Sequence, residues 1–191
     1  MFTTELKFDA LFTDLQFLNH AVREKLDYAS GMERNYTFYA TEKDDKTCVF
    51  VRCEEQLNDQ HINWKADNFD CQVGDELKVN VRANPVDRVD GKYCNLTGKA
   101  ARTYFRDMLH RAGLEVIRIK LSNSRLCIKR EGLRDIGMLA QSFTSDVRVI
   151  DKEKFMQSYG SGIGRRKNVG FGMIKIMEHK VPEKKAVKIS V

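Results

Sequence analysis

The sequence predicts an α+β protein made of two similar modules, and three of its features support this prediction. Short stretches in which apolar and polar residues alternate recur along the chain, as expected for half-buried strands. Stretches with helical spacing separate them, in an order that is repeated in the second half. The 191 residues are 42% hydrophobic and 31% charged, a length and composition that allow two compact domains.

The first strand and the first helix are defined by their patterns. Thr4, Leu6 and Phe8 alternate with charged residues, which indicates a strand. Asp14 can cap the helix that follows, and Ser30-Gly31 would end it. The apolar stripe of this helix consists of residues at helical spacing: Leu15, Leu18, Val22 and Leu26.

Two strands over residues 36–40 and 48–53 flank a polar turn at 43–46 and predict a hairpin. A short helix near residues 61–66 and a strand over 69–73 complete a βαββαβ unit, which is the ferredoxin-like (RRM-like) order.

The second half repeats this order and adds a hairpin. Residues 77–83 alternate perfectly and form the clearest strand. The remaining elements, in chain order, are a loop over 84–99, a helix over 100–111, a hairpin of strands 116–121 and 126–130 with its turn at Ser122-Asn123-Ser124, a strand over 143–150, a helix over 152–159 and a strand over 171–177.

We therefore expect tandem ferredoxin-like domains, residues 1–73 and 74–191. The connection at Gly74-Asp75 is too short for a flexible tether, so the domains should pack rigidly side by side. The cleft between their sheets is a natural place for a polymeric ligand, although the topology alone specifies no activity.

The composition restricts the partners. A net charge of +6 and a pI of about 9.0 favour an anionic partner. The five cysteines include no C-x-x-C pair, so we expect reduced, structural thiols with no metal site and no cofactor. The sequence has no apolar run of membrane-spanning length and no signal-peptide pattern, which predicts a cytoplasmic protein with no membrane partner.

The stretch SGIGRRKNVGFGMIKI near the C-terminus, together with Gly160 just before it, holds five of the 12 glycines within 13 residues. Glycine lets backbone N–H groups approach a phosphate, and neighbouring cations supply charge, so this loop suits a phosphodiester chain. It follows a predicted helix and lacks a Gly-Lys-Ser/Thr ending, unlike a mononucleotide-binding loop. The alternative is an ordinary basic surface turn. The residues that would contact RNA are Gly162, Gly164, Arg165, Arg166 and Lys167.

His20 and Phe17 lie roughly 150° around the first helix from its apolar stripe, so both should face outward. An outward Phe one turn from a His suggests a surface that stacks on bases. The alternative is a lone surface His beside a Phe that a neighbouring loop covers.

The loop pattern G-x-G-R-x-K-x-x-G-x-G between a helix and an apolar strand resembles the glycine-rich loop of the RAMP superfamily of CRISPR-associated proteins. The segment VGDELKVNVRANPV is similar to a strand of its CasE family, the repeat-processing endoribonucleases of Cascade-type systems. The segment from Arg34 to Glu42, R-N-Y-T-F-Y-A-T-E, is similar to that family as well. These likenesses cover residues 3 to 178.

The resemblance implies a metal-independent endoribonuclease that cuts CRISPR repeat transcripts at the base of a stem-loop. It implies 2′,3′-cyclic phosphate and 5′-hydroxyl ends, and retention of the mature crRNA with other Cascade-type subunits. His20 matches the family's catalytic His, and Phe17 stands where the family has Tyr. Phe17 has no hydroxyl, so it can supply only stacking.

RNA cleavage without a metal needs a base, an acid and cations near the phosphorane, and a His can serve either proton role at neutral pH. Glu24, one turn from His20, would favour the acid role. Arg23 and Lys25 are the nearest cations, and Lys25 stands where some family members carry Lys. Solvated surface charge is the alternative for both.

Arg118 and Lys120 alternate with apolar residues and predict a basic sheet face that could follow an RNA backbone, extended by Lys129, Arg130 and Arg134. We also expect Arg34 to contact RNA. The rival functions are a non-catalytic RAMP subunit that holds guide RNA, an RNA-binding module unrelated to CRISPR, and a small-molecule enzyme.

Overall fold

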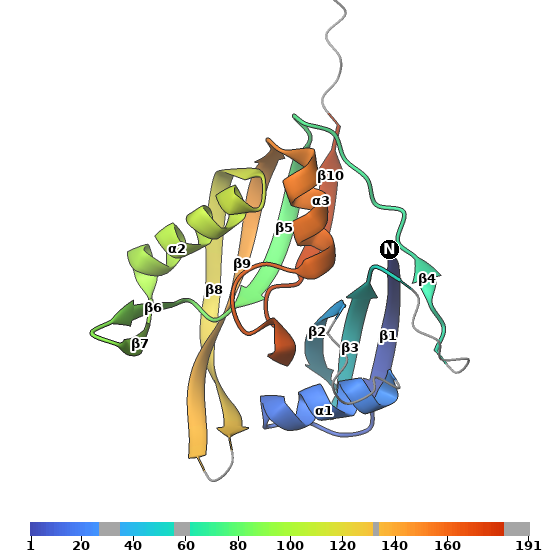
Figure 1. Ribbon diagram of the computed structural model, residues 1–191, viewed down its shortest axis with the longest axis vertical. Helices are drawn as coiled ribbons and strands as arrows, with labels where there is room; N and C mark the ends of the chain where they lie inside the picture. The colour runs from blue at the N-terminus through green and yellow to red at the C-terminus, as the bar shows by residue number, and fades with distance from the viewer. Residues whose placement is uncertain (27–34, 56–61, 132–133, 182–191) are drawn as a thin grey trace, which may run out of the picture.

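The computed structural model describes residues 1–26, 35–55, 62–131 and 134–181, which form two four-stranded antiparallel sheets with helices packed on one side of each (Figure 1). Sheet A has the strand order β2-β3-β1-β4, and sheet B has the order β10-β5-β9-β8. Within the described residues, no helix has the length and apolar character needed to span a bilayer. The α+β class is as the sequence predicts.

Sheet A and its helix account for the first third of the chain. Its elements are β1 (Phe2–Phe8), α1 (Leu15–Lys25), β2 (Tyr36–Lys43), β3 (Lys46–Cys53) and β4 (Lys65–Ala66). Leu6, Leu18, Val22 and Phe38 are buried together, so the apolar stripe of α1 covers one face of the sheet. The predicted hairpin is confirmed, with Asp44 and Asp45 at positive φ in its tight turn.

Sheet B is larger and carries two helices. Its elements are β5 (Glu76–Ala83), α2 (Gly98–Arg111), β8 (Leu114–Glu131), β9 (Arg134–Val149), α3 (Lys152–Ser161) and β10 (Ile174–Lys180). The core between the sheet and the helices includes Val79, Phe105, Phe143 and Phe155. The alternation on β5 decides this arrangement, because its apolar side chains all point to one face.

Two expectations at the end of the first module are wrong. Residues 65–66 form β4, not a helix, because they pair with the edge of β1 through Phe2 and Thr3. Residues 69–73 form no strand. Phe69 and Cys71 instead pack into the core under sheet B, where the Phe69 ring centre lies 4.9 Å from that of Tyr159. His61 and the predicted helix end at Ser30-Gly31 lie outside the described residues.

Two expectations in the second module are also wrong. The segment 116–130 is not a hairpin but part of the single long strand β8, and the register against β9 shifts between Leu121 and Ser124. The polar Ser-Asn-Ser segment is therefore a bulge, because β9 remains paired on both sides of it. The predicted loop at 84–99 contains a hairpin of β6 (Val86–Val89) and β7 (Lys92–Asn95), which turns at Asp90 and Gly91.

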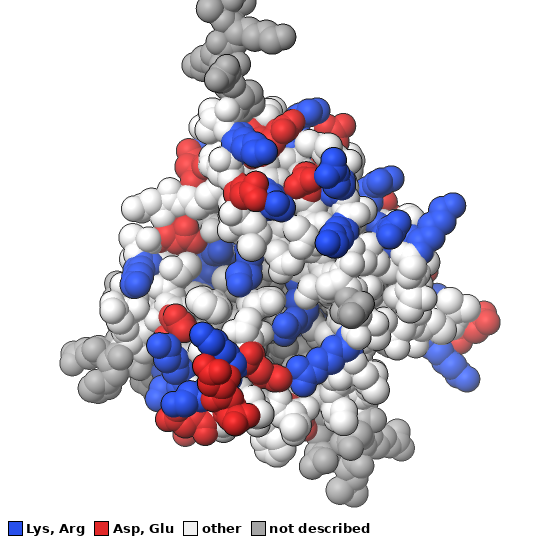
Figure 2. All heavy atoms as spheres, turned by 180° about the vertical axis from the view of Figure 1, so that it is seen from behind, with Lys and Arg blue, Asp and Glu red and all other residues white. Residues whose placement is uncertain are grey.

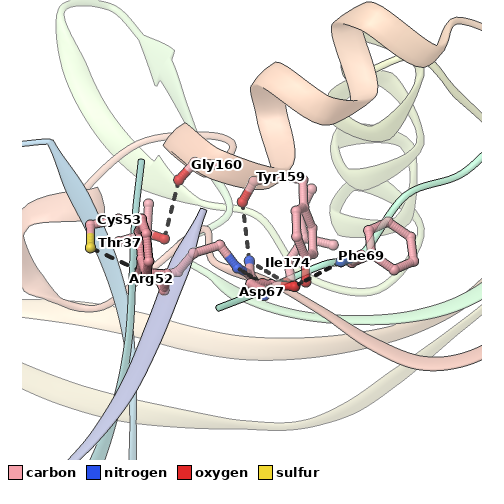
Figure 3. Close-up of polar contacts among 9 residues, drawn as sticks. Thr37, Arg52, Cys53, Asp67, Phe69, Tyr159, Gly160 and Ile174 are labelled. Atoms are coloured by element: carbon pink, nitrogen blue, oxygen red, sulfur yellow. Dashed lines mark hydrogen bonds and ion pairs between the residues drawn. The ribbon is translucent and has the colours of Figure 1, made fainter. Parts of the chain in front are cut away.

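The two sheets are joined through Arg52 of β3 (Figure 3). Its side chain donates to the carbonyl oxygens of Tyr159 at 3.0 Å and Ile174 at 2.9 Å, and it pairs with Asp67 at 3.1 Å. Thr37 donates to the carbonyl oxygen of Gly160 at 3.4 Å. Tyr159 and Ile174 flank the glycine-rich loop, so sheet A holds both ends of that loop.

Candidate nucleic-acid interface

The first helix presents His20 and Phe17 to solvent. Asp14 caps the helix by accepting a hydrogen bond from the backbone N–H of Gln16 at 2.6 Å. Leu18 and Val22 turn inward, so the opposite face is left outside the core. The side chain of Phe17 is 59% exposed and His20 is exposed, as the helical spacing predicts.

The neighbour of His20 is an amide, not the expected carboxylate. Nε2 of Gln16 lies 3.3 Å from Nε2 of His20, one turn earlier on the helix. The two nitrogen atoms are within hydrogen-bonding distance, and which of them donates depends on the tautomer of the imidazole. Glu24 is exposed, and the ion pair that a His forms among the described residues is that of His179 with Asp75, not of His20 with Glu24. The spacing of four residues between Gln16 and His20 is the sequence signal that could have found this pair.

The two candidate cations of the helix are not placed alike. Lys25 is exposed in the last turn and lies about 140° around the helix from His20 at 100° per residue. Arg23 is half-buried and lies about 60° from His20 by the same spacing. Among the described residues, the hydrogen bond recorded for His20 is with Gln16 and not with either cation, so the helix alone does not assemble a cationic site around the imidazole.

The glycine-rich loop folds back on itself where α3 ends. Gly172 donates its N–H to the carbonyl oxygen of Arg82, and its own carbonyl accepts from Ile163, both at 2.8 Å. Gly172 has a φ of +84°, and a Cβ there would overlap the carbonyl oxygen of Ile163. Gly162 caps α3 at a φ of +73°, and a Cβ there would crowd Thr37 of sheet A. These glycines are required by close backbone approach within the protein.

The loop carries a short 3-10 helix, η1 (Lys167–Val169), that packs against α1. Val169 and Phe171 are buried with Met138 and Ala140 of β9, and Leu15 of α1 lies against this cluster. The packing brings the glycine-rich loop and the helix that carries His20 into one region. The sequence signal for this contact is the pair of apolar residues, Val169 and Phe171, within an otherwise polar loop.

The three cations of the loop differ in their surroundings. Arg165 is exposed, and its guanidinium lies 5.4 Å from the ring centre of Tyr93 in β7. Arg166 is half-buried at a φ of +62°. Lys167 is half-buried with its Nζ 3.5 Å from the carbonyl oxygen of Gly162. Gly164 is exposed and Gly162 is buried, so the accessible part of the loop is centred on Gly164 and Arg165.

The model of the family of CRISPR associated proteins matches residues 23–177 of this chain. The chain belongs to that family. The family resemblance of its motifs is thereby confirmed. Comparison with curated protein sequences gives no match.

Solved structures of CRISPR proteins share the fold. Thermus thermophilus Cse3 bound to an RNA representing a pre-cleavage complex superposes with a TM-score of 0.74 at 16% identity, over 93% of this chain and 100% of that one. Cas6e from Escherichia coli K-12 superposes with a TM-score of 0.71 at 18% identity, over 92% and 98% of the two chains. The predicted tandem ferredoxin-like fold is confirmed.

A large pocket lies beside the glycine-rich loop of this CRISPR-associated chain. It has a volume of about 1060 Å³ and is bounded by α2, the end of α3 and the β6–β7 hairpin. Its charged lining residues are Lys99, Arg111, Arg165, Asp87 and Asp107. The sequence predicts a loop over residues 84–99, so the β6–β7 wall of this pocket is seen only in the structure.

Other predicted RNA contacts are not brought to His20. Arg118 and Lys120 lie on the face of sheet B that the helices leave open, and Nε of Arg118 is 3.9 Å from Asp146. Helix α1 packs on one face of sheet A, on the side of the molecule that also carries α2 and α3 (Figure 1). The two cations lie on the open side instead, so they and His20 belong to different faces of the molecule. Arg34 and the side chains of Lys129, Arg130 and Arg134 lie outside the described part of the chain.

Proposed function

We propose that this chain is an endoribonuclease that cuts CRISPR repeat transcripts at the base of the repeat stem-loop without a metal ion. The products would be mature crRNA with a 2′,3′-cyclic phosphate and a downstream RNA with a 5′-hydroxyl. The protein would keep the crRNA and join other subunits of a Cascade-like complex.

The packing of η1 against α1 is the observation that carries this proposal. It places the basic glycine-rich loop next to the helix that presents His20 and Phe17. A loop suited to phosphates beside a solvent-facing His and an aromatic ring matches the needs of RNA cleavage. A phosphate held by the loop would bring its ribose toward the surface of α1.

The relatives support the same substrate class. Among the solved structures with this fold are a CRISPR endoribonuclease, Cse3, bound to a 19-nucleotide RNA, and a chain of a CRISPR RNA-guided surveillance complex. Family membership makes a CRISPR repeat transcript the natural substrate to test.

An imidazole such as that of His20 can remove the 2′-hydroxyl proton at neutral pH. The 2′ oxygen then bonds to the adjacent phosphorus while the bond from phosphorus to the 5′ oxygen breaks. The departing oxygen takes a proton from water or from the imidazolium just formed. Phe17 can stack on a neighbouring base and orient the ribose, but its ring supplies no proton.

The loop contributes charge and not proton transfer. Arg165 is exposed and can approach the phosphate, where a guanidinium would stabilise the extra negative charge of the phosphorane. Arg23 and Lys25 remain proposed helpers from α1, and Arg23 is the closer of the two to His20 around the helix.

A second candidate is a subunit that holds guide RNA without cutting it. The observation that favours it is Phe17, because the helix then offers a single proton-transfer group at this position. The glycine-rich loop would bind RNA equally well in either case.

The test is to incubate labelled repeat hairpin RNA in EDTA with the wild type, His20→Ala and His110→Ala, and to score both cleavage and gel-shift binding. His110 is an exposed His in the last turn of α2 and serves as the matched control. A hairpin with a 2′-deoxyribose at the cleavage position tests the nucleophile. We expect wild type and His110→Ala to cut, and His20→Ala to bind without cutting.

Equal cutting by His20→Ala would exclude this residue from the chemistry. Binding without cutting by all three proteins would favour the RNA-holding subunit. Cutting of the deoxy substrate would exclude attack by the 2′ oxygen.

A further inference from the structure

The two sheets leave one face open, on the side opposite the helices. Viewed from that side, several Lys and Arg side chains lie around a hollow between the sheets, with Asp and Glu side chains on part of its rim (Figure 2). The alternation along the strands explains why polar residues gather there. On β5, Lys78, Asn80 and Arg82 point to the open side, while the apolar residues between them enter the core.

A pocket of about 470 Å³ lies in this hollow and is lined by both sheets. Lys7 comes from β1, Lys65 from β4 and Lys175 from β10, and Glu5 is the only carboxylate in the lining. Within the described residues, none of these three lysines is paired with a carboxylate. Among the described residues, the lining of the pocket is therefore net positive.

Lys175 and Arg82 converge on one aromatic ring. Nζ of Lys175 lies 4.3 Å from the ring centre of Tyr39, and the guanidinium carbon of Arg82 lies 4.6 Å from it. Arg82 also donates to the carbonyl oxygen of Ala40 at 3.0 Å. Burial, with a smaller contribution from Arg82, lowers the pKa of Lys175. A bound anion would relieve the repulsion between these two cations.

Aromatic rings lie beside the cations. Tyr39 and Phe50 are direct partners across β2 and β3, and both are half-exposed on the open side of sheet A. Nζ of Lys175 is 5.0 Å from the ring centre of Phe50 as well. Cations interleaved with aromatic rings in a groove are typical of sites that bind single-stranded nucleic acid, since the phosphates meet the charges and the bases meet the rings.

From these observations we infer that the cleft between the sheets binds a single-stranded segment of the RNA, separately from the stem-loop at α1. A pocket of about 470 Å³ is too small for a duplex and suits one or two extruded nucleotides. Arg118 and Lys120, on the open face of sheet B, would extend the path of the strand. The identity of the strand as repeat RNA rests on the proposed function.

The test compares three proteins on two RNA ligands: a single-stranded oligonucleotide with the sequence that flanks the repeat stem-loop, and the isolated stem-loop. The cleft variant is Lys7→Gln with Lys175→Gln. The control variant is Lys46→Gln with Lys154→Gln, which removes the same charge from exposed positions outside the cleft. The affinity for each RNA is measured across a series of salt concentrations. The rate of stem-loop cleavage is measured in parallel, at a stem-loop concentration that saturates the protein.

We expect the cleft variant to bind the single-stranded RNA about tenfold more weakly. The slope of its log affinity against log salt should fall by about 1.4, because each lost phosphate contact on a single strand contributes roughly 0.7. Stem-loop cleavage should equal that of the wild type. In the wild type, a 5-iodouridine version of the strand should photo-crosslink to the peptides that contain Tyr39 or Phe50.

Equal losses in the cleft and control variants, or crosslinks only outside the cleft, would overturn this inference. Tight binding of a polyglutamate peptide that displaces the single strand from the cleft would instead indicate an acidic protein partner. If the wild type fails to cut the stem-loop but the cleft variant still loses the single strand, the cleft site stands and the proposed function fails.

Discussion

The guanidinium of Arg52 lies 3.6 Å from the ring centre of Tyr159 and donates a hydrogen bond to the backbone carbonyl of the same residue. The tyrosine hydroxyl in turn donates to Asp67 at 3.1 Å, the carboxylate that pairs with Arg52 (Figure 3). Arg52 and Asp67 have side chains only 6% and 12% exposed. We refer to Arg52, Asp67 and Tyr159 as the Arg52 junction.

Loss of the arginine should strongly destabilise the protein. Arg52→Met leaves the buried Asp67 without its cation, and breaking a buried pair in this way costs about 3–5 kcal/mol. Chemical denaturation measures the free energy of unfolding. Lys46→Met, which breaks an exposed pair with Asp9, is the control and should change it little. Adding Asp67→Asn to Arg52→Met should restore part of the loss, and no recovery would show that the unpaired carboxylate is not its cause.

The Arg52 junction also predicts a loss of stability in alkali. Burial raises the pKa of Tyr159 to about 12, whereas the unfolded residue ionises near the ordinary tyrosine pKa of 10.0. Between these values the unfolded state releases a proton that the folded state retains, so the free energy of unfolding should fall as pH rises. Denaturation at pH 9 and pH 11 measures the fall, which should be smaller in Tyr159→Phe. An equal fall in that variant would assign the effect to other groups, among them Tyr104, whose pKa burial also raises.

Gly172→Ala should disrupt the glycine-rich loop. The new Cβ would overlap the backbone of Ile163, so the loop must shift as well as accept a strained φ. Gly91→Ala is the matched control, because Gly91 has a similar φ of +78° but open space around it. The control should lose only about 1–2 kcal/mol of stability and keep its RNA affinity. Gly172→Ala should lose more stability and bind the stem-loop more weakly, and unchanged stem-loop affinity would separate the loop from RNA binding.

Phe17→Ala should weaken binding of the stem-loop by about 1–3 kcal/mol, the usual contribution of a ring stacked on a base. Its thermal stability should stay close to that of the wild type, because the ring is 59% exposed. Phe17→Tyr should bind as the wild type does and cut faster, because it restores a hydroxyl one turn from His20. Gel shifts and single-turnover cleavage measure both effects. Unchanged affinity of Phe17→Ala would place the RNA away from this face of α1.

Much of the secondary structure was predictable because its causes are local. The side chain of Asp14 caps α1 two residues away, and the alternation of β5 needs no knowledge of its neighbours. The wrong predictions concern segments whose secondary structure depends on the strand with which they pair. Ser122 and its neighbours read as a turn, yet the continuous ladder with β9 makes them a bulge in β8.

The candidate site likewise has features that the sequence predicts and features that depend on the tertiary structure. The outward direction of Phe17 and His20 follows from the period of one helix, and the family follows from motifs that are contiguous in the chain. The separation of Arg118 from His20 could not be seen along the sequence, because it depends on which face of each sheet the helices cover.

By itself the sequence determined the α+β class, the outward face of α1 and the basic glycine-rich loop, since each depends on residues within a few turns of one another. Only the tertiary structure decided that η1 packs on α1, that Arg52 holds both ends of the loop, and that Lys175 and Arg82 meet over Tyr39. These contacts join segments that are far apart in the chain. They form because burying an apolar side chain is favourable and burying an unpaired charge is costly, and the packing of the sheets determines which residues are close enough to pair.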